Sequence, residues 1–397
     1  AIAGEPNFLG CQLLARLNLR PAQTDEFVVR VERAGMIILG RTNVPEVLSA
    51  ATTESALHGP CRNPWDVSRS PGGSSGGSGA AVAALLVAAA QASDGGGSTR
   101  IPAGANGVVG LKPTRGLVTQ SPSMTSWVDI TNTKSWHTRS VRDTAALLDV
   151  VAGSGFADTG SAPAPARPYL EEVGAPPGQL RIGFMRQLPG NSMPLDPEAV
   201  KAVEATAKLL ADLGHHVEES HPEPLNTAEH FELILTYWPM KVAQRLAAAE
   251  AKLGRLIAPE EVEPSTFQML QFAREHSIVD LGIALENIYA YTKRMLSWYR
   301  QGFDLLLTPM LGCPPPPLGL LIDPAQRKQG MLWGGFAPLA NLTGQPAISL
   351  PLHWTAADLP LGVQLVGDLW REDLLIRVAA QLERAHPWAQ RVPPIHG

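Results

Sequence analysis

The sequence predicts an α/β protein, because segments with helix character alternate with segments of strand character along much of its length. A helix over residues 24–34 runs directly into an apolar stretch at 36–39, which we expect to be a strand. A strand over 180–184 precedes a helix over 196–213. The apolar run at 304–309 has the length and composition of a buried strand.

The remaining elements follow from local signals. Residues 139–151 have the apolar periodicity of an amphipathic helix. Residues 227–302 are predicted to be mostly helical, with breaks at Pro259 and Pro264. A final helix is expected over 372–383.

The composition is that of an ordinary enzyme of 397 residues, 45% hydrophobic and 17% charged, which is long enough to bury a large core. A net charge of −5 gives no polybasic footprint for nucleic acid or an anionic membrane. The longest apolar run, at 80–90, is far shorter than the roughly 20 residues of a membrane span. Three widely spaced cysteines, Cys11, Cys61 and Cys313, indicate a reducing compartment, so we predict a cytoplasmic protein.

Two segments rich in glycine and serine are the strongest functional signal. They are PGGSSGGS at residues 71–78 and DGGGSTR at 94–100, and they contain the candidate serines Ser74 and Ser98. Glycines before a serine let the backbone approach a ligand and turn N–H groups toward an oxygen that becomes negative during acyl transfer. The residues between them, 79–92, are nearly all apolar helix formers, so we expect a buried helix that joins the two loops.

Other interpretations of these loops are weaker. Glycine and serine alone are typical of flexible linkers, but two such segments flanking an apolar helix are not. The run at 72–76 fits the G-x-S-x-G nucleophile elbow, yet no apolar strand precedes it. No glycine-lysine-serine or glycine-lysine-threonine follows either loop, so nucleotide binding is not indicated. The histidines show no metal-binding spacing, and we expect neither a metal nor a cofactor.

Taken together, these motifs resemble the amidase signature family. The resemblance runs from about residue 25 to the C-terminus and is weakest between about 155 and 300. The segments that carry it are GRTNVPE at 40–46, NPWD at 63–66, RSPGGSSGGS at 69–78, DGGGSTR at 94–100, GVVGLKPT at 107–114, NLTGQPAISLP at 341–351 and PLGVQ at 360–364.

The resemblance implies a fold and an activity. The fold would be an α/β/α sandwich, in which helices cover a large mixed β-sheet, built as a single domain over 1–397 with a variable, mostly helical region at 227–302. Substrate choice would depend on that region. The activity would be hydrolysis of amide bonds through an acyl-enzyme, using a Ser–Ser–Lys triad without histidine.

Site residues are carried over position by position. Ser98 would be the nucleophile, and Ser74 would be the bridging serine, joined to Gly73 by a cis peptide bond. The oxyanion would be held by N–H groups of the loop, at Gly95, Gly96, Gly97 and Ser98. Gly95 stands where relatives commonly have an apolar or hydroxyl residue, which we expect to loosen the loop slightly. Residues that would support the site are Ser75, Asp94 and Arg100.

The substrate pocket and the base are less directly indicated. Met124, Trp127 and Trp136 follow the signature, where relatives line the acyl pocket, although a place in the core is an equal alternative for the aromatic residues. The family's base is a buried lysine, which must be desolvated to be neutral at working pH. The first lysine here is Lys112, at a position that is structural in the family. We therefore expect the catalytic lysine in a missing segment ahead of Ala1.

The sequence accordingly predicts an amidase that acts on a small-molecule amide. Finer similarity is to bacterial amidases near the 6-aminohexanoate cyclic dimer hydrolases, so the substrate would be a linear or cyclic amide such as a 6-aminohexanoate oligomer. Two alternatives stay open: a glutamine-dependent amidotransferase of the A type, which works with partner subunits, and a catalytically inactive amidase-like binding module. No nucleic acid or membrane partner is expected, and a homodimer is compatible with the prediction.

Overall fold

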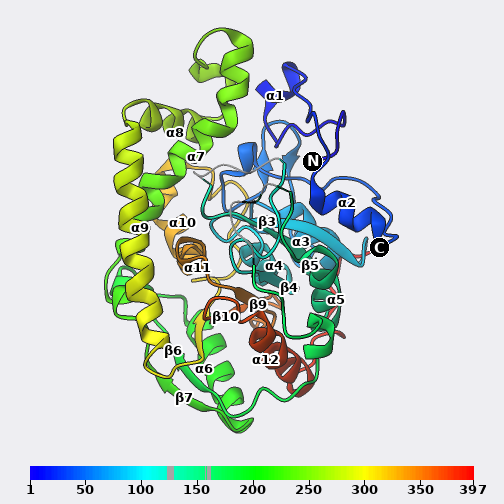
Figure 1. Cartoon of the computed structure of the whole chain (residues 1–397), viewed down its shortest axis with the longest axis vertical. Coiled ribbons are helices and arrows are strands. Elements are labelled where there is room, and N and C mark those ends of the chain that lie inside the picture. The colour runs from blue at the N-terminus through cyan, green and yellow to red at the C-terminus, as the bar shows by residue number, and fades with distance from the viewer. Residues whose placement is uncertain (123–128, 157, 159–161) are drawn as a thin grey trace.

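The computed structural model describes residues 1–122, 129–156, 158 and 162–397. Within them the main sheet has eight strands in the order β3-β5-β4-β9-β10-β8-β6-β7 (Figure 1). In that order the strands are β3 (Ala89–Asp94), β5 (Thr133–Thr138), β4 (Val109–Lys112), β9 (Ala347–Leu350), β10 (Val363–Gly367), β8 (Leu305–Pro309), β6 (Arg181–Phe184) and β7 (His216–Glu219).

The sheet is mixed. Neighbouring strands are antiparallel from β3 through to β8, whereas β6 is parallel to both β8 and β7. In its middle, Leu365 of β10 lies opposite Ile348 of β9 and Leu307 of β8. All three are fully buried, so the register of the central strands is fixed by apolar packing.

Helices cover both faces of the sheet. They are α1 (Gln12–Arg16), α2 (Glu26–Arg33), α3 (Gly76–Ala83), α4 (Arg100–Asn106), α5 (Val141–Val151), α6 (Pro197–Asp212), α7 (Glu229–Leu253), α8 (Pro264–Arg274), α9 (Ile278–Tyr299), α10 (Arg327–Gly334), α11 (Pro338–Thr343) and α12 (Glu372–Ala385). Figure 1 shows α7 and α9 along one side of the molecule and α2 and α5 along the other.

Alternation along β8 shows why this is an α/β/α sandwich. Leu305 and Leu307 pack in a cluster with residues of α5, α6 and α12. Leu306, between them, packs in a second cluster with residues of α7, α9 and α11. Successive side chains of a strand point to opposite faces, so both faces of the sheet are buried and the predicted fold class is confirmed.

Most predicted helices and strands are present, and their ends have local causes. Helix α5 begins after Ser140, whose hydroxyl accepts a hydrogen bond from the Asp143 N–H at 3.0 Å. Helix α6 begins after Asp196, whose carboxylate accepts from the Glu198 N–H at 2.8 Å. In the 227–302 region, α7, α8 and α9 confirm the helical prediction, and Pro264 opens α8.

The prediction of one helix over 79–92 is wrong. Helix α3 ends at Ala83, Leu85 has a φ of 63°, and Leu86 is 63% exposed. The chain then forms β3, which pairs with β5 along its whole length. Alanine is a strong helix former, but differences in helix propensity are small, so the hydrogen bonds and packing offered by β5 override that preference.

The strand predicted at 36–39 is also wrong. Ile37 and Leu39 are 84% and 77% exposed, and the segment is not part of a strand. A strand needs a neighbouring backbone to complete its hydrogen bonds, and the described chain does not place one beside this segment.

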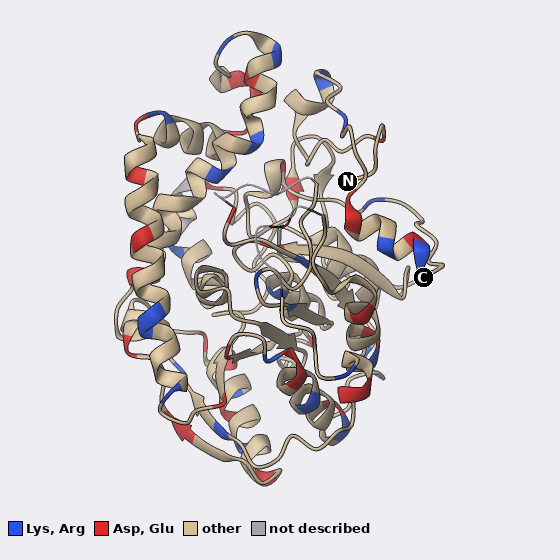
Figure 2. Ribbon diagram, viewed as in Figure 1, with Lys and Arg blue, Asp and Glu red and all other residues tan. Residues whose placement is uncertain are grey.

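The surface carries both signs of charge. Figure 2 shows acidic and basic residues close to one another along outer helices such as α9 and α12. Ion pairs such as Arg294 with Glu229 link neighbouring elements. None of the helices in the described part of the chain is long and apolar enough to cross a membrane.

Candidate active site

The first loop lies between the short hairpin of β1 (Glu54–Ser55) and β2 (Gly59–Pro60) and helix α3. The peptide bond between Gly73 and Ser74 is cis, and Ser74 is 1% exposed. A side chain at Gly73 would meet backbone of Thr52 at 2.5 Å, which explains why glycine stands there. The loop is therefore packed into the protein and is not a flexible linker.

The second loop connects β3 to α4 and contacts the first. The Ser98 carbonyl accepts a hydrogen bond from the Ser75 N–H at 3.3 Å. The Ser75 hydroxyl in turn bonds to the backbone of Ser93, at 3.4 Å to its carbonyl and 3.3 Å from its N–H. Ser98 is 9% exposed. The structure thus joins the two loops through Ser75 and Ser98, and Ser74 immediately precedes Ser75.

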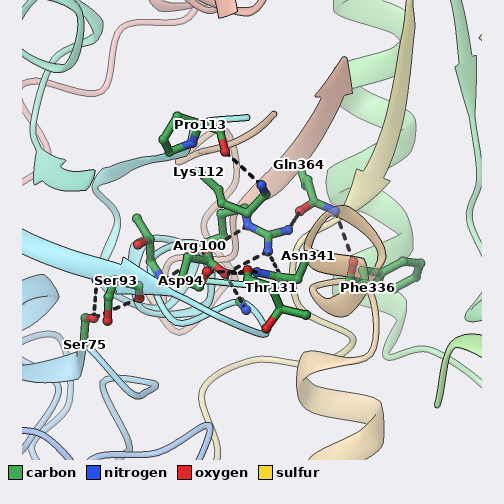
Figure 3. Close-up of polar contacts among 12 residues, drawn as sticks. Ser75, Ser93, Asp94, Arg100, Lys112, Pro113, Thr131, Phe336, Asn341 and Gln364 are labelled. Atoms are coloured by element: carbon green, nitrogen blue, oxygen red, sulfur yellow. Dashed lines mark hydrogen bonds and ion pairs between the residues drawn. The ribbon is translucent and has the colours of Figure 1, made fainter. Parts of the chain in front are cut away.

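Asp94 and Arg100 form a buried ion pair that closes the second loop (Figure 3). Both side chains are fully buried, and Arg100 Nε lies 2.9 Å from Asp94 Oδ2. Asn341 of α11 donates to Asp94 Oδ1 at 2.9 Å and accepts from Arg100 at 2.6 Å. Burial opposes the charged carboxylate, but the charge of Arg100 outweighs it and lowers the pKa of Asp94 to about 2. Asp94 is therefore an anion at any working pH.

The N–H groups of the loop divide into two sets. Asp94 accepts hydrogen bonds from Gly97 at 2.6 Å and from Thr99 at 3.3 Å, so these two N–H groups shape the loop. The N–H groups of Gly95, Gly96 and Ser98 have no acceptor among the described residues. Of the expected oxyanion donors, the Gly97 N–H is therefore already bound within the loop.

Lys112, the first lysine of the sequence, is fully buried in β4. Its ammonium donates to the Pro113 carbonyl at 2.9 Å, and neither candidate serine is among its hydrogen-bond partners. Burial, with a further contribution from the nearby Arg100 charge, lowers the pKa of Lys112 to about 7. Its position beside Arg100 fits a structural role better than that of a base for Ser74.

Sequence reasoning missed a second buried lysine at this loop. Lys241 of α7 is 1% exposed, forms an ion pair with Asp129, and donates to Thr131 Oγ1 at 3.0 Å. A β-carbon added to Gly95 would lie 2.9 Å from Lys241 Nζ and 3.3 Å from the ring of Trp238. The sequence signal that could have revealed Lys241 is its spacing from Trp238, because residues three apart lie on the same face of a helix.

Of the three predicted pocket residues, Trp136 is the one in the described part of the chain, and it does not face the site. On β5, a ring nitrogen of His137 lies 2.6 Å from the Thr99 carbonyl. His137 therefore faces the second loop, residues 94–100, which we call the nucleophile loop. Trp136, the preceding residue, points to the opposite face, where its ring lies 5.0 Å from that of Phe27 in the main core. Trp136 is thus a core residue. Met124 and Trp127 lie outside the described residues.

Comparisons with known proteins agree with this geometry. The profile of the family described as Amidase matches residues 2–376. A 6-aminohexanoate-cyclic-dimer hydrolase from Pseudomonas sp. (strain NK87) is 39% identical over 381 residues, which cover 93% of this chain and 77% of its own. A solved structure of 6-aminohexanoate cyclic dimer hydrolase complexed with substrate has a TM-score of 0.94 and 37% identity, covering 100% of this chain and 85% of that one.

More distant structures share the fold. A bacterial aryl acylamidase of the amidase signature family has a TM-score of 0.89 at 25% identity, covering 98% of this chain and 81% of its own. A component of the glutamyl-tRNA(Gln) amidotransferase from Thermotoga maritima has a TM-score of 0.81 at 26% identity, covering 100% of this chain and 84% of its own.

Proposed function

Because this chain belongs to the amidase family and is an amide hydrolase, we propose that it cleaves its substrate through an acyl-enzyme on Ser98. The observation that carries the proposal is the contact between the two serine loops. The cis Gly73–Ser74 bond, the Ser75 N–H bond to the Ser98 carbonyl and the buried Asp94–Arg100 pair hold both loops in one rigid site. Such fixed geometry is what positioning a nucleophile and an oxyanion requires.

In the proposed reaction the Ser98 hydroxyl attacks the amide carbon, and a carbon–oxygen bond forms as the carbonyl oxygen becomes negative. That oxygen is held by the free N–H groups of Gly95, Gly96 and Ser98. The Ser98 proton passes through Ser74 to a base, a role that a neutral lysine fills in the family triad, and from that base to the amine as the carbon–nitrogen bond breaks. Water then cleaves the acyl-enzyme by the reverse transfer.

We further propose that the substrate is a linear or cyclic amide of the 6-aminohexanoate type. Two similarities support this choice: 39% identity to a 6-aminohexanoate-cyclic-dimer hydrolase and a TM-score of 0.94 to a solved structure of such an enzyme. The amidotransferase component is more distant, at 26% identity and a TM-score of 0.81. Neither that alternative nor an inactive binding module is favoured.

We also propose a homodimer that works in the cytoplasm. The sequence is compatible with a homodimer, and its three cysteines are free, which is consistent with a reducing cytoplasm. Sedimentation of the purified protein would test the oligomeric state. A stable complex with unrelated proteins would instead favour the amidotransferase alternative.

The function is tested by hydrolysis of 6-aminohexanoate cyclic dimer, together with the intact mass of the protein after treatment with phenylmethylsulfonyl fluoride. We expect the wild type to hydrolyse the dimer and to gain one sulfonyl adduct. Ser98→Ala should lose both properties, and Ser74→Ala should lower both by several orders of magnitude. A folded wild-type protein without an adduct would refute the proposed nucleophile, whereas an adduct without hydrolysis of the dimer would refute only the substrate.

A further inference from the structure

We propose that Lys241 is a positioning residue for amide hydrolysis: its ammonium fills the space beside Gly95 and turns positive charge toward the N–H groups that would hold the oxyanion. This inference rests on the proposed function, because it assigns a role at the same site. It concerns a residue of α7, in a region that contributes none of the motifs discussed above.

The first argument is steric. The nearest atom to a β-carbon built on Gly95 is Lys241 Nζ at 2.9 Å, and the next are two ring carbons of Trp238 at 3.3 Å. The Trp238 ring also covers Gly96, at 3.7 Å from the corresponding position. Glycine at 95 therefore does not leave a loose loop, contrary to the expectation from sequence, because α7 supplies the packing.

The second argument is that Lys241 is held in place. Its ammonium is fixed by the Asp129 carboxylate and the Thr131 hydroxyl, and it lies 5.0 Å from the centroid of the Trp238 ring. Thr131 also belongs to the loop network, because its carbonyl accepts from Asn341 at 3.1 Å. The same asparagine binds Asp94, so Lys241 is connected to the nucleophile loop through hydrogen bonds as well as through Gly95.

The third argument concerns charge. Nζ is the nearest atom to the Gly95 position, so the positive end of the Lys241–Asp129 pair points at the loop. In a site without water, an oriented charge of this kind stabilises negative charge that develops on a nearby oxygen. Lys241 therefore reinforces the free N–H groups of Gly95 and Gly96 without touching the substrate.

The charge of Lys241 depends on pH within an accessible range. Burial lowers the pKa of Lys241 to about 8, and the positive charge of Arg245 lowers it further. The negative charges of Asp129 and Asp94 oppose this shift. Arg245 and Tyr237 also belong to α7, and burial raises the pKa of Tyr237 beyond the working range. The ammonium is present below about pH 8 and is lost above it, so the rate at Ser98 should fall as pH rises through 8.

The test is the pH dependence of inactivation by phenylmethylsulfonyl fluoride, corrected for hydrolysis of the reagent. This reagent is neutral, so its binding does not require the lysine charge. In Lys241→Met we expect a rate constant about 10-fold lower at pH 7, which is less than the 10²–10³-fold effect of removing a direct oxyanion donor. The decline between pH 7 and 9 should be absent from this variant. Lys241→Arg keeps its charge throughout this pH range, so this variant should also lack the decline but should react faster than Lys241→Met.

A matched control is Lys134→Met. Lys134 is also a buried lysine in an ion pair, 2.9 Å from Asp25, but it shares a face of β5 with Trp136, away from the nucleophile loop. The Lys134→Met variant should be less stable than the wild type, and its inactivation should have the same pH dependence as that of the wild type. If Lys241→Met alone does not fold, Lys241→Met with Asp129→Asn removes both charges and gives the same readout.

Coupling to Gly95 provides an independent measurement. Gly95→Ala should slow inactivation of the wild type, and it should cost much less in Lys241→Met, where the facing ammonium is gone. Additive effects, or a Lys241→Met profile that matches the wild type in rate and pH dependence, would overturn the inference while Ser98-dependent inactivation still stands. A wild-type protein that the reagent does not modify at Ser98 would overturn the proposed function and this inference with it.

Discussion

At the scale of single residues, the shape of the nucleophile loop requires glycine at position 97, where neighbouring atoms leave no room for a side chain. Gly97 has a φ of 118°, which strongly favours glycine, and an added β-carbon would lie 2.3 Å from the Ala337 side chain. Its N–H is bound to Asp94 at 2.6 Å. Backbone conformation, packing and hydrogen bonding thus all fix the position of Gly97. Because Ser98 is the next residue, its backbone is held in place as well.

We therefore expect Gly97→Ala to lower the free energy of unfolding by about 2–4 kcal/mol and the hydrolysis rate by more than about 10-fold, through backbone strain and overpacking. Urea unfolding and amide hydrolysis measure the two effects. Gly282→Ala is the control, since that glycine lies in α9 with no atom within 4 Å of an added β-carbon. It should be neutral or stabilising by up to about 1 kcal/mol. Normal activity in Gly97→Ala would show that the loop tolerates a different path.

At the scale of elements, the site is assembled from segments that meet across one face of the sheet. Loop 71–78 runs into the first turn of α3, and the nucleophile loop follows β3. Asn341 belongs to α11 and Lys241 to α7. Helix α5, by contrast, covers the other face, where Val141 and Leu148 pack in the main core. Changes to α5 should therefore act on stability and leave the chemistry intact.

Ser140→Ala removes the hydroxyl that caps the first turn of α5, and we expect a loss of about 1 kcal/mol in the free energy of unfolding. The hydrolysis rate should be unchanged, because the helix lies across the sheet from Ser98. Thermal unfolding and a hydrolysis assay on the same preparation check both statements. Ser297→Ala, an exposed serine in the last turns of α9, should change neither. A large loss of activity in Ser140→Ala would contradict this separation of the two faces.

At the scale of the whole molecule, the ion pairs of Glu172 join the segment at 167–172 to α12, which is distant in sequence. Glu172 accepts hydrogen bonds from Arg167 and from Arg377 of α12. These bonds, with Arg167 the largest contribution, lower the pKa of Glu172 to about 2, and that of Asp94 has the same value. A carboxylate whose pKa is lower in the folded state stabilises the fold above its unfolded pKa of about 4.

Stability should accordingly be constant from about pH 7 to pH 5 as far as these two groups are concerned, and fall as pH drops from about 4 toward 2. Protonation then requires Asp94 and Glu172 to give up their arginine partners. The urea midpoint measured at about pH 7, 4 and 3 tests this expectation. Glu172→Gln should be less stable at neutral pH and should show a shallower decline in acid. Equal slopes in the variant and the wild type would remove Glu172 from the explanation.

Much of the fold could be predicted because its signals are local. Ser140 and Asp196 mark helix starts, and the apolar run of β8 has no polar alternation, as suits a strand buried on both faces. The segments at 36–39 and 79–92 could not be predicted correctly. Whether such a stretch is a strand, a helix or an exposed loop depends on a partner that sequence does not display.

The sequence by itself determined the α/β class, the two serine loops and the resemblance to the amidase signature family. These features rest on residue types at fixed short spacings, which a single chain displays directly. Only the tertiary structure decided that the Gly97 N–H is bound to Asp94, that Trp136 faces the core and that Lys241 fills the space at Gly95. Each of these depends on which residues, far apart in the chain, the sheet and its covering helices bring into contact.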